Sequence, residues 1–95
     1  MTARSGWHGI PPGTDRFVPP LQLEAPTAGI TEPARSPALW VDLEYRDGSV
    51  HTRKGFAMAW TTTQVLVQWI EHSRAREAWV RADQCTRREI PGRTP

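Results

Sequence analysis

Residues 39–48, LWVDLEYRDG, carry the strongest structural signal in the chain. Apolar side chains at 39, 41, 43 and 45 alternate with Trp40, Asp42 and Glu44, which is the period-2 pattern of a strand with one buried face. Asp47-Gly48 then predicts a two-residue type I′ hairpin turn, because that turn requires residues that accept a positive φ. The stretch therefore predicts the first strand and the first turn of an antiparallel β-domain.

Four more strands are predicted after this turn. The second strand covers residues 50–60 and has a bend or bulge at Lys54-Gly55. Residues 65–70, VLVQWI, predict an interior third strand because both of their faces are apolar except at Gln68. A polar loop over 71–77, a fourth strand over 78–81, one helical turn over 81–85 and a fifth strand over 86–90 complete the expected order. A helix over 64–79 is the alternative, but β-branched residues at a spacing of two favour strands.

The first 37 residues differ from the rest of the chain. They contain seven of the nine prolines, and their apolar residues follow neither a helical nor a strand period. We therefore expect a flexible Pro/Gly-rich tail over 1–37, a small β-barrel domain over 38–91 and a disordered C-terminus over 92–95. One apolar patch at 17–23, FVPPLQL, is expected to dock on the chain's own domain or on a partner.

The composition limits the possible classes of protein. The net charge is only +2, and eleven of the twelve basic residues are arginines, a skew typical of GC-rich genomes. We therefore expect an actinobacterium or one of its phages as the source. A single cysteine cannot form an internal disulfide, and no apolar run is long enough to cross a membrane. These features predict a cytoplasmic monomer with no membrane contact.

Two segments resemble a known pattern of small barrels. Residues 65–69, VLVQW, are followed by a polar loop and then by residues 78–84, AWVRADQ. This order is similar to the Tudor and chromo-type pattern, in which a valine-rich strand ends in an aromatic residue and a polar loop leads to an aromatic–valine pair. The resemblance covers residues 38–90 and implies an all-β fold, a five-stranded SH3-like small barrel. Such barrels bind peptides, methylated lysines or nucleic acids, or assemble complexes, so the fold alone does not select a function.

The sequence offers little for catalysis. No pair among the three histidines has the spacing of metal ligands, and Cys85 is interpreted as a small buried hydrophobic residue. Asp42 and Glu44 share a strand face, which a general acid–base pair could use but which is more typical of a solvated edge strand. There is no phosphate-binding glycine loop. We therefore predict a non-catalytic protein without a metal or a cofactor.

The leading functional hypothesis is an interaction module that binds a protein or peptide, for example as an accessory or regulatory factor. Trp40 alternates onto the polar side of its strand and should be partly exposed, whereas Trp60 and Trp69 are expected in the core. A basic or proline-rich peptide would suit this acidic, aromatic face. The alternative explanation for an apolar contact at Trp40 is that the patch at 17–23 covers it. The predicted protein-binding residues are Trp40, Asp42, Glu44, Tyr45, Phe17 and Leu21.

Two other functions stay open. Nucleic-acid binding would need convergence of the basic residues into one patch, although interleaved carboxylates favour a salt-bridged surface. The predicted residues are Arg53, Lys54, Arg74, Arg76, Arg81, Arg87 and Arg88. A structural role in a phage particle or a larger complex is the second alternative.

Overall fold

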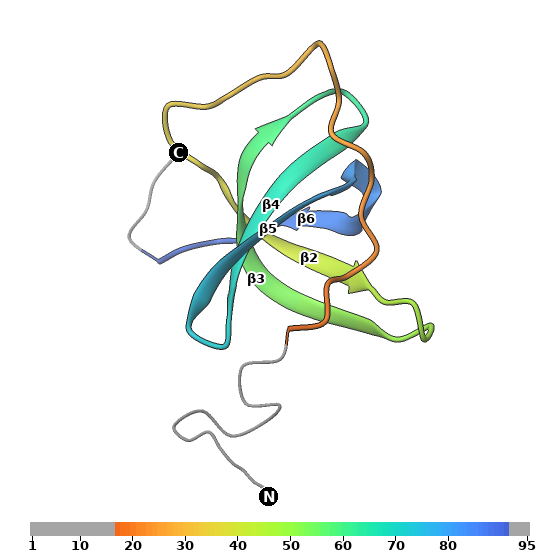
Figure 1. Cartoon of the computed structure of the whole chain (residues 1–95). Helices are drawn as coiled ribbons and strands as arrows, with labels where there is room; N and C mark the ends of the chain where they lie inside the picture. Colours follow the sequence, from red (N-terminus) through yellow and green to blue (C-terminus); the bar gives the residue numbers. More distant parts are fainter. Residues whose placement is uncertain (1–16, 92–95) are drawn as a thin grey trace, which may run out of the picture.

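The computed structural model describes residues 17–91, and every structural statement below concerns these residues. The flexibility predicted for residues 1–16 and 92–95 lies outside them. Five antiparallel strands form one open sheet in the order β5-β4-β3-β2-β6 (Figure 1). The elements are β2 (Ala38–Glu44), β3 (Val50–Trp60), β4 (Gln64–Glu71), β5 (Arg74–Arg81), the 3-10 turn η1 (Ala82–Gln84) and β6 (Cys85–Arg87). The prediction of a mostly β fold is confirmed, and the single helical turn lies where it was expected.

The hairpin between β2 and β3 differs from the predicted turn. The N–H of Gly48 donates to the carbonyl of Tyr45 at 2.9 Å, and Gly48 alone in this connection has a positive φ, of 89°. Asp47 instead accepts hydrogen bonds on Oδ1 from the N–H and the hydroxyl of Ser49, which hold the pKa of its carboxyl below the ordinary value. The predicted two-residue type I′ turn is therefore wrong, because the connection spans five residues and needs only one left-handed position.

The polar loop predicted at 71–77 is also wrong. β4 and β5 pair up to Glu71 and Arg74, and His72 and Ser73, with φ of 53° and 63°, make a two-residue turn. Both central residues are left-handed, as a type I′ turn requires, although neither is glycine or asparagine. The fourth strand is consequently eight residues long instead of four, and the helical alternative over 64–79 is excluded.

Gly55 lies where the backbones of two strands approach each other closely. A Cβ atom on Gly55 would lie 2.6 Å from the carbonyl oxygen of Gln68 in β4, so only glycine fits. The predicted irregularity exists but lies further along β3, where the register shifts between Ala57 and Ala59. Both alanines are buried.

The core lies on the inner face of the curled sheet. Trp69 is only 2% exposed and Val67 is fully buried, as predicted, and Trp60 is half-buried and packs against them. The buried apolar cluster draws on four of the five strands, and its members are Leu39, Val41, Leu43, Ala57, Val67, Trp69, Ala78 and Val80. Cys85 of the short fifth strand packs against this cluster. The alternation that opens β2 therefore identifies its buried side chains correctly.

Residues 17–23, which we call the strap, cross the opening between the two sides of the sheet. The N–H of Leu21 donates to the carbonyl of Glu44 at the end of β2, at 2.7 Å. Two residues later, the N–H of Leu23 donates to the carbonyl of Trp79 on the edge strand β5, at 2.8 Å. The strap runs alongside the sheet, in orange in Figure 1. It therefore links two strands that are not paired with each other.

The rest of the predicted tail also contacts the sheet. Thr31 exchanges two backbone hydrogen bonds with Trp60, at 2.7 and 3.0 Å, and the carbonyl of Pro37 accepts from the N–H of Ala57. The mobility expected for residues 1–37 stays a prediction, and these contacts name the positions at which it should be measured.

Candidate functional site

The outer face of the sheet carries a groove of about 670 Å³ across β2, β3 and β4. Its apolar lining includes Trp40 from β2, Phe56 from β3 and Ile70 from β4. Trp40 is 38% exposed, as its alternation onto the outer face predicts, and Ile70 is 64% exposed. These large apolar side chains lie together on the surface and have no role in the core, which is typical of a binding surface.

Arg88 forms part of the groove wall. Its guanidinium lies 5.4 Å from the ring centre of Phe56 and 5.8 Å from that of Trp40. Nε donates to the carbonyl of Leu39 and Nη2 to that of Gly55, each at 3.0 Å. The side chain thus fastens the residues after β6 to β2 and β3, and it fixes a positive charge between two aromatic rings.

The groove has both cations and carboxylates around it. Its lining includes Lys54 and Arg88, and also Arg53, whose guanidinium lies 3.9 Å from the Glu71 carboxylate. The acidic residue nearest along β2, Asp42, accepts a hydrogen bond from the hydroxyl of Thr52 at 2.7 Å. On the other side, Glu77 accepts one from the amide of Gln68 at 3.1 Å. Each of these carboxylates is therefore bonded to a side chain that lines the groove.

Glu44 and Leu21 lie at the strap and not in the groove. The Glu44 carboxylate pairs with Arg81 at 3.0 Å, and its carbonyl accepts the N–H of Leu21. Arg81 also pairs with Asp83 at 3.0 Å, and these two carboxylates hold the pKa of its guanidinium above the ordinary value. The structure therefore ties Glu44 into the contact between β2 and β5.

Tyr45 and Phe17 pack against the core. Tyr45 meets His51 edge-on, with ring centres 5.2 Å apart, and its hydroxyl pKa is raised by burial and by the nearby charge of Glu71. The Phe17 ring lies 4.0 Å below the guanidinium of Arg76. Of the six predicted protein-binding residues, the structure places only Trp40 in the outer groove, with Asp42 beside it.

The basic residues predicted for nucleic-acid binding do not gather at one place. Arg74 and Arg76 lie on β5, whereas Arg87 and Arg88 lie at β6, the opposite edge of the sheet. Arg76 covers Phe17, Arg81 pairs with two carboxylates, and Arg88 is bonded to the backbone. Lys54 and Arg53 line the groove. These cations therefore occupy separate local environments.

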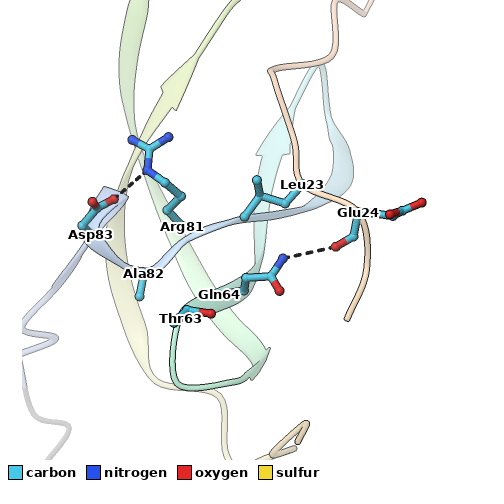
Figure 2. A pocket seen from close by; sticks show the side chains of 7 residues that line it. All are labelled: Leu23, Glu24, Thr63, Gln64, Arg81, Ala82 and Asp83. Carbon is cyan, nitrogen blue, oxygen red and sulfur yellow. Dashed lines mark hydrogen bonds and ion pairs between the residues drawn. The ribbon is translucent and has the colours of Figure 1, made fainter. Parts of the chain in front are cut away.

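A second hollow lies between the strap and the turn η1 (Figure 2). It has a volume of about 660 Å³, and Leu23, Gln64 and Arg81 are among the residues that line it. The amide of Gln64 donates to the carbonyl of Glu24 at 3.2 Å, which holds the chain after the strap against β4. We assign this hollow to the docking of the strap.

Sequence reasoning missed Ile70 and Phe56 as surface residues. Ile70 belongs to a strand that is apolar on both faces, so periodicity could not tell which side chains face outward. The useful signal was the position of Gln68, the one polar residue of the strand. By alternation Ile70 shares the face of Gln68, whereas Val67 and Trp69 share the other face. A strand with neighbours on both sides still has two faces, and only one faces the core.

No group of three or more His, Cys, Asp or Glu side chains in residues 17–91 is placed to hold a metal ion. Burial raises the pKa of the Cys85 thiol to about 11, with further contributions from Asp42 and Asp83. Over the same residues, no helix is long and apolar enough to cross a membrane.

Comparison of the chain with models of protein families, with curated proteins and with solved structures gave no match.

Proposed function

We propose that this chain is a non-catalytic interaction module that binds a segment of a partner protein in the outer groove. The observation that carries the proposal is the joint exposure of Trp40 and Ile70 around Phe56. Aromatic side chains at the centre of a patch supply much of the free energy of protein binding, and truncating one often costs about 2 kcal/mol or more.

The described part of the predicted tail does not fill this groove. No described residue before Trp40 lines the groove, and the strap lies instead between β2 and β5. An extended peptide is a suitable occupant because the groove is open and runs across three strands, with apolar side chains that can receive anchors. The same surface would serve a structural role in a larger complex.

We also infer that the fold is an SH3-like small barrel. Its support is the strand order β5-β4-β3-β2-β6 together with the 3-10 turn before the last strand. In this view the strap closes the opening that direct strand pairing leaves. Because barrels of this class bind many kinds of ligand, the inference about fold adds no choice of partner.

The test selects twelve-residue peptides from a random display library on the full chain and maps the backbone amide shifts that they cause. We expect the shifts at Trp40, Lys54, Phe56 and Ile70. Trp40→Ala and Ile70→Ser should each weaken binding more than tenfold. Val50→Ser is the matched control, since Val50 is 57% exposed on the same face but does not line the groove.

Two results would count against the proposal. Shifts confined to the strap or to β5 would place binding elsewhere, as would equal effects of Ile70→Ser and Val50→Ser. A version of the chain without residues 1–16 should give unchanged amide shifts at Lys54 and Ile70. A change there would mean that the chain's own N-terminus occupies the groove.

A further inference from the structure

The charges that line the groove differ in sign from the face predicted from the sequence. Trp40, Asp42 and Glu44 alternate along β2 and predict an acidic surface, but Glu44 is bound to Arg81 and Asp42 to Thr52. The lining residues themselves include three cations and no carboxylate, and Arg53 among them is paired with Glu71, which leaves Lys54 and Arg88. A ligand that enters the groove therefore meets the charges of Lys54 and Arg88.

The cations stand around the apolar side chains. Lys54 is the partner of Trp40 in the β2–β3 register and is exposed, so the two residues are neighbours on the outer face. The guanidinium of Arg88 lies near the rings of both Trp40 and Phe56. An apolar anchor between Trp40 and Ile70 would consequently have cations close to it on the β2–β3 side.

We propose that the groove recognises an acidic peptide that carries a large apolar anchor flanked by Asp or Glu. The inference rests on the proposed function and names the chemistry of the partner. A carboxylate on the peptide would pair with Lys54, while the anchor covers Trp40 and Ile70. Opposite charges at the rim mainly set specificity and the rate of association, and the apolar contact supplies most of the affinity.

A single-stranded nucleic acid also combines stacking with negative charge, but the groove suits it less. Such sites line up aromatic rings so that successive bases can stack on them. Here one face of Trp40 is approached by Arg88, Phe56 is half-buried, and the most exposed apolar residue is the aliphatic Ile70. We therefore favour an acidic peptide.

The experiment measures the affinity of the full chain for two peptide sets with the same central Trp or Leu, flanked in one by Asp and Glu and in the other by Lys and Arg. We expect the acidic set to bind at least tenfold more tightly. Lys54→Glu should weaken that binding about fivefold or more. Arg74→Glu makes the same change in net charge outside the groove and should alter it less than twofold.

The outcomes separate the two proposals. If Trp40→Ala and Ile70→Ser abolish binding but the two peptide sets bind equally, the acidic preference is wrong and the groove remains the site. If neither substitution affects binding, the proposed function fails, and the inference fails with it. If twelve-nucleotide oligothymidine binds with the same dependence on Lys54 and displaces the acidic set, the ligand is a nucleic acid and the inference is overturned.

Discussion

Arg88 joins three parts of the molecule through one side chain. Its two backbone acceptors lie on β2 and β3, and its guanidinium lies against Trp40 and Phe56. Arginine fits this position because its planar fork can donate in two directions while it stacks on rings. The same residue therefore stabilises the sheet and shapes the groove.

Replacing Arg88 with lysine should reveal this role. Arg88→Lys keeps the charge but cannot make both hydrogen bonds, so we expect a loss of about 1–3 kcal/mol in the free energy of unfolding. The measurement is urea denaturation followed by tryptophan fluorescence. Arg87→Lys is the control, since Arg87 is exposed on β6, and it should change stability by less than about 0.5 kcal/mol. Equal effects of the two substitutions would contradict the bonding described here.

Cys85 should be slow to react in the folded protein. Its pKa is raised from 9.0 to about 11, chiefly by burial, so roughly one thiol in a thousand is ionised at pH 8, compared with about one in ten when unfolded. We expect alkylation at pH 8 to be about 100-fold slower in the native protein than in denaturant, and to accelerate about tenfold per pH unit up to pH 10.

The sign of the accompanying stability change follows from the same shift. The folded state holds the thiol proton more tightly, so its contribution to stability is complete below pH 9 and is lost as the pH rises from 9 towards 11. Asp42→Asn removes a nearby negative charge and should increase the native rate of alkylation. An equal rate in the native and unfolded chains would show that the thiol is not buried.

Among the elements, the strap is the one without regular strand pairing, and its contribution to stability can be tested directly. Its two hydrogen bonds alternate along the chain, at Leu21 and Leu23, as they would in a strand. Leu21→Pro and Leu23→Pro each remove one donor, and we expect each to lower stability by about 1–2 kcal/mol. Gln22→Pro is the matched control, because it stiffens the same segment without removing either donor.

Amide hydrogen exchange gives a second measurement on the same element. The N–H groups of Leu21 and Leu23 should be protected if the strap stays docked, with protection no greater than that of the core strands. Fast exchange at both positions, together with no effect of either proline, would mean that the strap is mobile in solution. That result would favour a flexible tail over the whole of residues 1–37.

The sequence predicted those elements whose signals are local. Alternation at Leu39, Val41 and Leu43 identified β2 and its buried face, because one polar and one apolar face leave only one register. His72-Ser73 was missed as a turn since neither residue is a usual left-handed one. The strands that this turn joins, β4 and β5, depend on their partners across the sheet, and a single sequence does not reveal those partners.

The candidate site was harder to predict than the fold. Trp40 was found by its alternation, but the groove around it depends on Arg88, which lies 48 residues later, and on Ile70 from a third strand. The partners of the two β2 carboxylates could not be predicted for the same reason. The ion pair of Glu44 with Arg81 and the hydrogen bond of Asp42 with Thr52 are tertiary contacts.

At the scale of the whole molecule, the question is whether the excess of arginines makes the protein a nucleic-acid binder. The net charge is +2, and several cations are already engaged: Arg81 with two carboxylates, Arg76 with Phe17 and Arg88 with backbone carbonyls. The arginines of β5 and β6 also lie on opposite edges of the sheet. The phosphate backbone of a nucleic acid would therefore meet few cations in a row on this surface.

The salt dependence of oligonucleotide binding tests this argument over the whole surface. Each phosphate contact contributes about −0.9 to the slope of log affinity against log salt concentration on duplex DNA. With so few aligned cations we expect a slope shallower than about −2 and no measurable binding at 150 mM salt.

Replacing Arg88 in such a test would confuse lost binding with lost stability, because that side chain is bonded to β2 and β3. The informative variant is Arg74→Glu combined with Arg87→Glu, since both residues are exposed and lie on different edge strands. A slope near −5 that this double substitution reduces by about two would mean that the edges act together on one duplex, and it would make nucleic acid the leading partner in place of a peptide.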